Sequence, residues 1–133
     1  MLIANRTPQR ATEVAGISER CFAFPWEEMG NLFESADLIV NTTTLGMVGG
    51  QHFDWPIERA PNHCIVMDAV YTPLETPLLR AARARSMTAV DGLGMLIHQG
   101  ALSFEIWFGL QPDVRLARGR LMRAIAEKEE DLA

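Results

Sequence analysis

Five short, continuous apolar runs are the feature that most constrains how this chain can fold. They do not alternate with polar residues, and uninterrupted runs of this kind are typical of strands covered on both faces. Helical stretches lie between several of them, and strands that alternate with helices indicate a parallel, doubly wound α/β sheet. The expected strands cover residues 2–4, 21–24, 38–40, 64–67 and 88–90.

Two of the intervening helices carry a start signal. Thr7-Pro8 and Thr76-Pro77 each place a capping residue before a proline, which is favoured at the first helical position. We expect the first of these helices to stop at Gly16.

The last third of the chain has a different character. Residues 93–108 are apolar around most of the helical circumference, so this helix is expected to be buried on more than one side. Gly109 ends it, and a last amphipathic helix follows Pro112. We therefore expect an α/β domain over residues 1–92. Residues 93–133 are expected to be helices that pack on it and on another domain or subunit.

Composition narrows the class of protein. The 133 residues carry a formal net charge of −5, with an acidic run over 127–131. This argues against nucleic acid as a partner, because duplex binding needs a basic face. No apolar run approaches the roughly 20 residues of a membrane helix, and the N-terminus does not resemble a signal peptide. Cys21 and Cys64 lie in apolar runs and are expected to be thiols, with no disulfide or metal site, in a cytoplasmic protein.

The segment 5–10 follows the first expected strand and has the composition of a phosphate site. An acid at this position of a dinucleotide-binding fold selects NAD, whereas a cation admits the 2′-phosphate of NADP. Here no acid is present, and Arg6 and Arg10 flank a helix N-terminus capped by Thr7. A guanidinium donates two hydrogen bonds to a phosphate at once. The alternative is an ordinary capped helix with two solvated arginines.

Polar residues also follow the third and fourth strands. Thr42 and Thr43 could hydrogen-bond a cofactor at a strand end, or simply form a polar turn. Tyr71 offers a flat face and a hydroxyl to a nicotinamide ring or a polyhydroxylated substrate. Asp68 is equally consistent with a turn acid, and Tyr71 with a loop residue packed on prolines.

The run 91–101 is the most specific motif. Its two glycines, Gly92 and Gly94, let the backbone come close to a ligand at a strand-to-helix junction. Gly92, Met95 and Gln99 share one helical face. Gln99 needs a hydrogen-bond partner if it is buried, which a substrate hydroxyl or the neighbouring backbone would supply.

Four motifs, in this order and spacing, resemble the C-terminal half of shikimate dehydrogenases, the shikimate/quinate dehydrogenase family, over essentially the whole chain. The first motif is shared with other NADP-using families, including glutamyl-tRNA reductase, whereas the last is much more specific. The motifs are Asn5-Arg6-Thr7 with Arg10, Asn41-Thr42-Thr43, Asp68-Ala69-Val70-Tyr71 with Thr76-Pro77-Leu78, and Asp91-Gly92-Leu93-Gly94-Met95-Leu96 with Gln99.

The resemblance implies reversible reduction of 3-dehydroshikimate to shikimate by hydride transfer from NADPH, in the pathway to aromatic amino acids. At position 69 relatives often have a methionine, so Ala69 leaves that contact to the backbone. By this resemblance, the 2′-phosphate is bound by Asn5, Arg6, Thr7 and Arg10, and the cofactor cleft is lined by Thr42 and Thr43. The nicotinamide end is approached by Ala69, Gly92 and Met95, and the substrate is contacted by Tyr71 and Gln99.

Two parts of the family pattern have no counterpart here. Family members carry a catalytic lysine–aspartate pair in a separate N-terminal domain, and the single lysine of this chain, Lys128, lies in the acidic tail. The first Rossmann strand and its glycine-rich pyrophosphate loop are also missing, because Met1 falls at the expected second strand. We therefore expect no catalytic residue in this chain, an unpaired gap in the sheet, and negligible shikimate oxidation by the isolated chain.

Two other classes of protein compete with this interpretation. A non-catalytic nucleotide-binding or subunit-interaction module would use the apolar C-terminal helices to dock on a partner and would form a stable oligomer or heteromer. Another NADP oxidoreductase of similar architecture, such as glutamyl-tRNA reductase, is disfavoured by the run 91–99.

Overall fold

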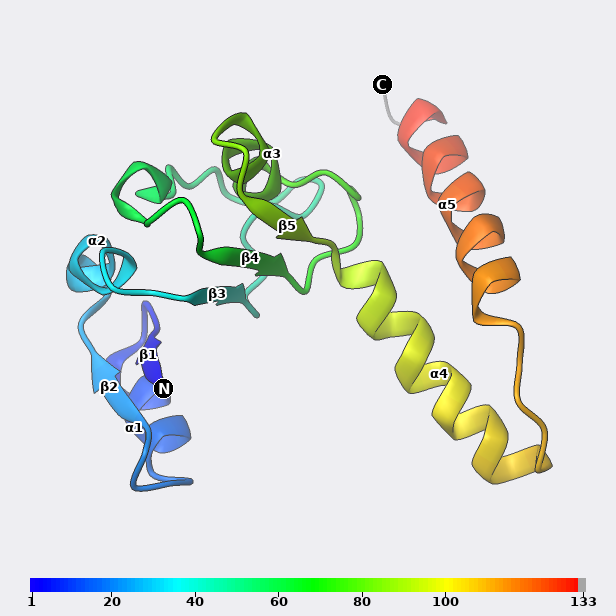
Figure 1. The fold of residues 1–133 in the computed structure, drawn as a ribbon, viewed down its shortest axis with the longest axis horizontal. Helices are drawn as coiled ribbons and strands as arrows, with labels where there is room; N and C mark the ends of the chain where they lie inside the picture. Colours follow the sequence, from blue (N-terminus) through cyan, green and yellow to red (C-terminus); the bar gives the residue numbers. More distant parts are fainter. Residues whose placement is uncertain (132–133) are drawn as a thin grey trace.

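All five expected strands form in the computed structural model, and every pairing between them is parallel (Figure 1). The structure describes residues 1–131. The side chains of residues 129–131, which belong to the expected acidic tail, and residues 132 and 133 of the expected C-terminal part lie outside the described residues. The α/β class is confirmed. The strands are β1 (Leu2–Ala4), β2 (Phe22–Phe24), β3 (Leu38–Asn41), β4 (Ile65–Asp68) and β5 (Thr88–Val90).

The strands divide between two small sheets. β1 pairs with β2, while β3, β4 and β5 form a second sheet in that order. In the second sheet Leu38 lies opposite Ile65 and Asn41 lies opposite Asp68. Within residues 1–131 no strand joins β1 to β3, so the two sheets are separate (Figure 1).

The helices begin and end close to where the capping signals place them. The Thr76 hydroxyl accepts a hydrogen bond from the Leu79 N–H at 3.3 Å, and Gly16 ends the first helix as expected. Gly109, at φ 67°, ends the long apolar helix in the left-handed conformation that glycine tolerates. The helices are α1 (Pro8–Ala15), η1 (Trp26–Glu28), α2 (Met29–Phe33), η2 (Ile57–Arg59), α3 (Pro77–Ala84), α4 (Gly92–Phe108) and α5 (Val114–Asp131).

One face of the β3–β4–β5 sheet packs against the main hydrophobic core, and the other face is exposed to solvent. Ile39 and Val66 pack with residues of α2, η2 and α3. On the opposite face Leu38 is 56% exposed, and Ile65 and Val90 are each 41% exposed. The expectation of strands covered on both faces is therefore wrong for this sheet, because no element within residues 1–131 packs on its second face.

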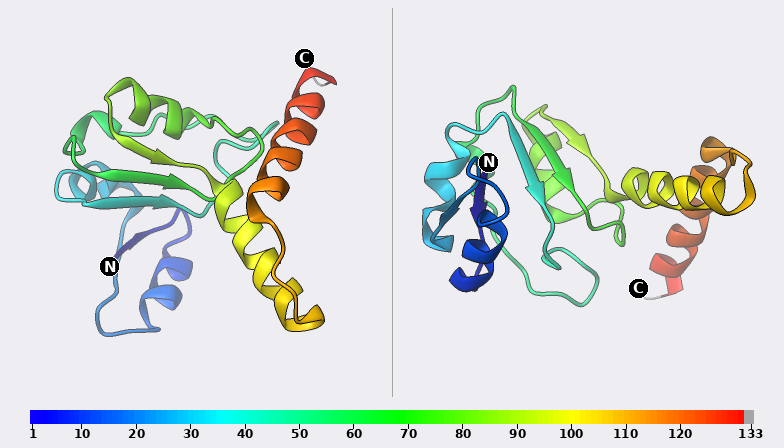
Figure 2. Two further views of the ribbon diagram at one scale, coloured as in Figure 1. Left: turned by 45° about the vertical axis from the view of Figure 1, so that its right-hand side comes forward. Right: turned by 90° about the horizontal axis from the view of Figure 1, so that it is seen from below.

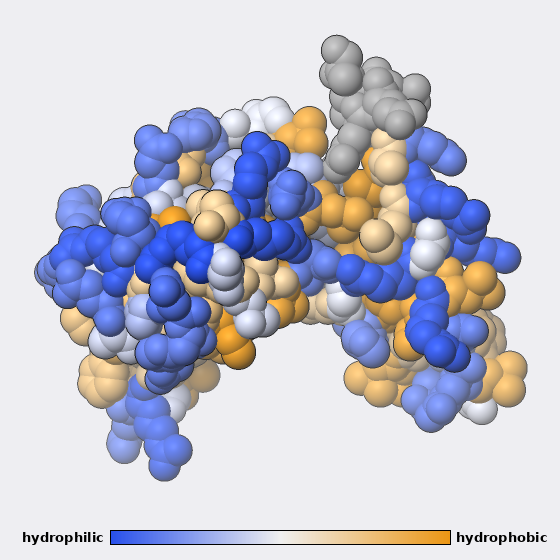
Figure 3. Space-filling model, turned by 45° about the horizontal axis from the view of Figure 1, so that its top comes forward, coloured by the Kyte–Doolittle hydropathy of each residue, from blue (hydrophilic) through white to orange (hydrophobic). Residues whose placement is uncertain are grey.

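α4 and α5 form a helical hairpin that leaves the sheet (Figures 1 and 2). Near the sheet, Leu93 and Ile97 are buried together with Ile125. Further along, Ile106 is 73% and Trp107 is 74% exposed, and apolar surface gathers at this end of the molecule (Figure 3). Within residues 1–131 α5 covers only part of α4, and the expected burial of its remaining surface by another domain or subunit stays a prediction.

Both cysteines are free thiols, as expected. Cys64 is fully buried, and burial raises the pKa of its thiol. Among residues 1–131, no helix has the length and apolarity needed to cross a membrane. The same residues contain no group of three His, Cys, Asp or Glu side chains that could hold a metal ion.

Candidate functional site

Three of the expected site residues directly follow the carboxyl ends of parallel strands. Asn5 follows β1, Thr42 follows β3, and Ala69 follows β4. In open α/β sheets, ligands bind at this edge. An exposed hydrogen bond from Arg6 to Gln51, in the loop after β3, links the end of β1 to the same region.

The loop after β1 is organised by Asn5 rather than by Thr7. Thr7 occupies the N-cap position of α1, but its side chain makes no capping bond. Instead, the Asn5 Oδ1 accepts a hydrogen bond from the Thr7 N–H at 2.8 Å. Arg6 and Arg10 are exposed beside this helix start. The Thr7 hydroxyl, two guanidinium groups and a helix N-terminus together form a surface suited to a phosphate.

Asn41, the last residue of β3, holds the second loop in place. Its buried Nδ2 donates to the Leu45 carbonyl at 3.1 Å and to Asp68 Oδ1 at 2.9 Å. Its Oδ1 accepts from the N–H and the hydroxyl of Thr43, at 2.9 and 2.7 Å. The Thr43 hydroxyl also accepts from the Leu45 N–H at 3.2 Å. Thr43 therefore shapes the loop, whereas Thr42 is exposed to the site.

Asp68 connects β3, β4 and the start of α3 through hydrogen bonds, so its role in this structure is to hold these elements together. The carboxyl group is fully buried. It accepts hydrogen bonds from Asn41 Nδ2 at 2.9 Å, from the Val70 N–H at 3.0 Å and from the Thr76 hydroxyl at 2.7 Å. These bonds satisfy the buried oxygens and fix the start of the loop that carries Ala69 and Tyr71.

Asp91 begins α4 and is held by an arginine from α5. Its Oδ1 accepts from the Leu93 and Gly94 N–H groups at 3.1 and 3.4 Å. Arg118 donates through Nη2 to Oδ2 at 2.6 Å and through Nη1 to Oδ1 at 3.2 Å. The hydrogen bond from Arg118 is the main cause that lowers the pKa of Asp91. Burial of the carboxylate raises this pKa, whereas the positive charge of Arg118 and the two backbone N–H groups lower it further. The orientation of α4 thus depends on α5.

The two glycines of the α4 motif have different surroundings. A Cβ at Gly92 would lie 2.5 Å from the Ala69 carbonyl carbon and 2.8 Å from the Val70 carbonyl oxygen. Gly92 therefore lets α4 pack directly on the backbone of the β4 loop. A Cβ at Gly94 would meet nothing within 4 Å. The backbone at Gly94 is therefore unobstructed on this side, whereas that at Gly92 is packed against the protein itself.

The side chains expected near the nicotinamide and the substrate are accessible. Tyr71, Met95 and Gln99 are all exposed. The Gln99 Nε2 donates to the Leu96 carbonyl of its own helix at 3.1 Å, so the backbone alternative holds in this structure. Lys128 is exposed on α5.

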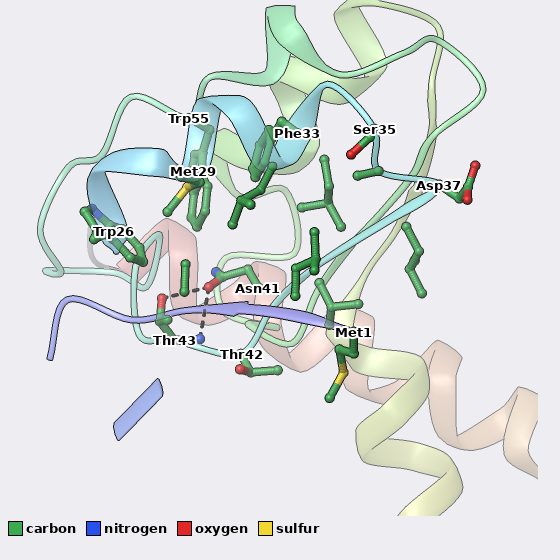
Figure 4. Close-up of a pocket in the computed structure, with 17 residues that line it drawn as sticks. Met1, Trp26, Met29, Phe33, Ser35, Asp37, Asn41, Thr42, Thr43 and Trp55 are labelled. Carbon is green, nitrogen blue, oxygen red and sulfur yellow. Dashed lines mark hydrogen bonds between the residues drawn. The ribbon is translucent and has the colours of Figure 1, made fainter. Parts of the chain in front are cut away.

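A slot between β1 and β3 measures about 480 Å³. It is lined by both strands and by Trp26, Met29, Phe33 and Trp55, and it ends at Asn41, Thr42 and Thr43 (Figure 4).

Three features of the site escaped sequence reasoning. Arg118 lies 27 residues from Asp91, and no local pattern connects them. Gln51 approaches Arg6 only because the loop after β3 folds back to it. The sequence motif includes Asn41, but its role as a buried hydrogen-bonding centre depends on its register with Asp68.

Comparisons with known proteins agree with this architecture. A family model described as the shikimate 5'-dehydrogenase C-terminal domain matches residues 92–122. A shikimate dehydrogenase (NADP(+)) from a Ruegeria species is 47% identical over 116 residues, which is 86% of this chain and 42% of that protein.

Solved structures show the same likeness. Quinate dehydrogenase from Corynebacterium glutamicum, in complex with NAD, superposes with a TM-score of 0.83 and 32% identity over 92% of this chain and 45% of that one. Shikimate 5-dehydrogenase from Thermus thermophilus, in complex with NADP(H) and shikimate, superposes with a TM-score of 0.75 and 36% identity over 93% of this chain and 45% of that one.

The chain thus spans less than half the length of these relatives. Within that span, the sequence identity, the matching fold and the family domain over α4 and the first part of α5 agree with one another. Over this span the chain is similar to the C-terminal part of shikimate dehydrogenases.

Proposed function

We propose that this chain is the NADP-binding part of a shikimate dehydrogenase, which interconverts 3-dehydroshikimate and shikimate on the way to aromatic amino acids. The relatives named shikimate dehydrogenase (NADP(+)) support this activity. Bound NADPH supplies the hydride in this reaction. The lysine–aspartate pair that handles the alcohol proton belongs, in this proposal, to the part of the enzyme that this chain does not span.

The loop after β1 is the observation that carries the cofactor assignment. Residues 5–10 contain no acid, so nothing there would repel a 2′-phosphate. Arg6 and Arg10 are exposed at the N-terminus of α1, and the Thr7 hydroxyl makes no capping bond within the helix. Two cations and a helix N-terminus fit the doubly charged 2′-phosphate better than a free ribose hydroxyl.

The remaining cofactor and substrate residues keep their proposed roles. Thr42 and Thr43 line the cofactor cleft, while the Ala69 backbone, Gly92 and Met95 approach the nicotinamide. Gly92 serves by packing α4 against the Ala69 and Val70 backbone, which brings the two loops together. Tyr71 and Gln99 contact the substrate, and their exposure leaves both side chains free to do so.

A further part of the proposal concerns the rest of the enzyme. Residues 1–92 act as a partial nucleotide-binding domain, and residues 93–133 dock on a substrate domain or partner subunit. The exposed Ile106 and Trp107 support this docking, because apolar side chains clustered on a surface mark interaction sites. Two free thiols support a cytoplasmic location.

A chimera tests the proposed activity. This chain would replace the matching region of the Ruegeria relative, so that the rest of that enzyme supplies the missing part. We expect shikimate-dependent reduction of NADP⁺ by the chimera and none by the isolated 133-residue chain. A folded chimera that binds neither NADPH nor shikimate would contradict the proposal, as would turnover by the isolated chain.

The exposed apolar side chains of α4 favour one alternative function, a non-catalytic interaction module. In that case the chain would form a stable oligomer or heteromer, visible by light scattering, and a folded chimera would show no turnover.

A further inference from the structure

The first turn of α4 lies directly against the loop that follows β4. Gly92 allows this approach, because a Cβ there would lie 2.5 Å from the Ala69 carbonyl carbon. Met95 and Gln99 lie about one and two turns further along the same helix. A rotation or shift of the first turn therefore moves both side chains relative to the Ala69 backbone.

Asp91 holds this first turn from two sides. Its Oδ1 accepts hydrogen bonds from the Leu93 and Gly94 N–H groups of α4. The same carboxylate accepts from both terminal nitrogens of Arg118 on α5. A planar guanidinium that bonds both oxygens fixes the distance and the plane of the carboxylate, which a single hydrogen bond does not.

α5 gives Arg118 a defined position. Asp113 Oδ1 accepts from the Arg115 and Leu116 N–H groups at 2.9 and 3.0 Å, which caps the first turn of α5. Further along, Ile125 is buried in the cluster that α5 shares with α4 (Figure 2). The guanidinium is therefore presented by a helix that is both capped and packed.

We infer that Arg118 is a positioning residue for hydride transfer: through Asp91 it fixes the first turn of α4, and with it the placement of the nicotinamide against the substrate. This inference rests on the proposed function, since it concerns the same site. Arg118 acts through a residue 27 positions away in the sequence and contacts the start of α4. Geometry of this kind affects rate strongly, because a misplacement of about 1 Å can cost about a hundredfold.

The rate should respond to Arg118 more than the affinity for the cofactor does. The proposed phosphate site at Arg6 and Arg10 follows β1, whereas α4 follows β5 in the separate sheet. Loss of Arg118 therefore leaves the anchored end of NADPH in place and displaces only the reacting end. A slower chemical step with unchanged NADPH affinity is the expected signature.

Single-turnover kinetics of the Ruegeria chimera test this inference. NADPH already bound to the enzyme is mixed with 3-dehydroshikimate, and its oxidation is followed by stopped flow. The rate constant reports the geometry of folded molecules, whereas a loss of folded protein lowers only the amplitude. We expect Arg118→Ala to lower the rate constant about tenfold, with NADPH affinity unchanged within about twofold. The exposed Arg120→Ala change is the matched control and should alter neither quantity.

Two further variants keep the test decisive if Arg118→Ala folds poorly. Arg118→Lys retains the charge but lacks the planar fork, so it should recover part of the lost rate. Asp91→Asn keeps an effective helix cap but loses the charge that Arg118 binds. We expect Asp91→Asn to slow hydride transfer about as much as Arg118→Ala. The double variant should be no slower, because both changes break the same link.

Hydrogen exchange of the cofactor-free chimera measures the link without any chemistry. Arg118→Ala should speed amide exchange at Leu93 and Gly94 at least about threefold, since the carboxylate that binds them is less fixed. The Leu79 amide, which Thr76 caps at the start of α3, is the internal reference and should not change.

Each remaining outcome counts against a particular claim. A rate constant for Arg118→Ala within about twofold of the unchanged chimera would overturn the inference. Rate losses of the two single variants that multiply in the double variant would do the same, as would unchanged exchange at Leu93 and Gly94. A chimera that shows no turnover before any substitution would instead sink the proposed function, and with it the role of Arg118 in hydride transfer.

Discussion

The guanidinium of Arg118 on α5 binds the carboxylate of Asp91 through both of its terminal nitrogens, at 2.6 and 3.2 Å. Asp91 in turn caps the first turn of α4. One ion pair therefore couples the last helix of the chain to the helix that carries Met95 and Gln99. The Asp91 side chain is 20% exposed and that of Arg118 37%, so solvent weakens this pair only in part.

The Arg118→Ala variant is expected to lose about 1 kcal/mol of unfolding free energy at neutral pH, since a charge-assisted hydrogen bond is lost and the pair is partly screened. The folded-state pKa of Asp91 is lowered, so this contribution is present above the unfolded pKa of about 3.9 and is lost as pH falls through the lower folded pKa. Urea unfolding should therefore show a lower unfolding free energy for the variant than for the unchanged protein at pH 7, and this difference should vanish in strong acid. The exposed Arg120→Ala change is the control, and an equal loss there would contradict the assignment.

The Asp68→Asn variant tests the buried hydrogen-bonding centre. An amide at this position presents a donor where Asn41 and Thr76 also donate, so we expect a loss of about 2–3 kcal/mol. Urea unfolding measures this loss. Asp37→Asn is the matched control, because the Asp37 side chain is 92% exposed, and its effect should stay within about 0.5 kcal/mol. Similar effects of the two changes would refute the structural role of Asp68.

The two glycines of α4 are expected to respond in opposite directions to alanine. Gly92→Ala forces a methyl group against the Val70 carbonyl oxygen at 2.8 Å, and we expect a loss of at least about 2 kcal/mol. Gly94→Ala meets open space inside a helix, so it should raise stability by about 0.5–1 kcal/mol. Thermal unfolding of both variants decides the matter, and a stable Gly92→Ala protein would show that α4 does not pack as described.

Arg6→Ala tests the proposed NADP selectivity. Loss of a charge-assisted contact to the 2′-phosphate should weaken NADPH binding about tenfold or more, while NADH binding stays unchanged. Calorimetric titration of the chimera with both cofactors measures this difference. Arg20→Ala, an exposed arginine beyond the other end of α1, is the control. Equal weakening of both cofactors would remove Arg6 from the phosphate site.

Gln99→Ala tests the substrate assignment. Gln99 is exposed and bonds only its own helix within the described structure, so its loss should leave stability unchanged. In the chimera we expect KM for shikimate to rise about tenfold, for one lost hydrogen bond, with NADPH affinity unaffected. Steady-state kinetics, with His98→Ala as the neighbouring control, separate an effect on KM for shikimate from an effect on NADPH affinity. Loss of NADPH affinity with unchanged KM would discard the assignment.

Local patterns predicted the secondary structure well because their causes lie within a few residues. Continuous apolar runs marked all five strands, and Thr76-Pro77 and Gly109 marked a helix start and a helix end. The burial of the elements could not be predicted in the same way. An apolar residue such as Trp107 indicates that burial is favourable, but it does not show that a partner surface lies within the same chain.

By itself, the sequence determined the α/β class, the parallel strands and the motifs that resemble the family. Each depends on local pattern or on the order of short motifs. Only the tertiary structure decided that Asp68 is a buried hydrogen-bonding centre, that the Asn5 side chain binds the Thr7 N–H before α1, and that Arg118 holds Asp91. These contacts join residues through strand register and helix packing, which no local spacing encodes.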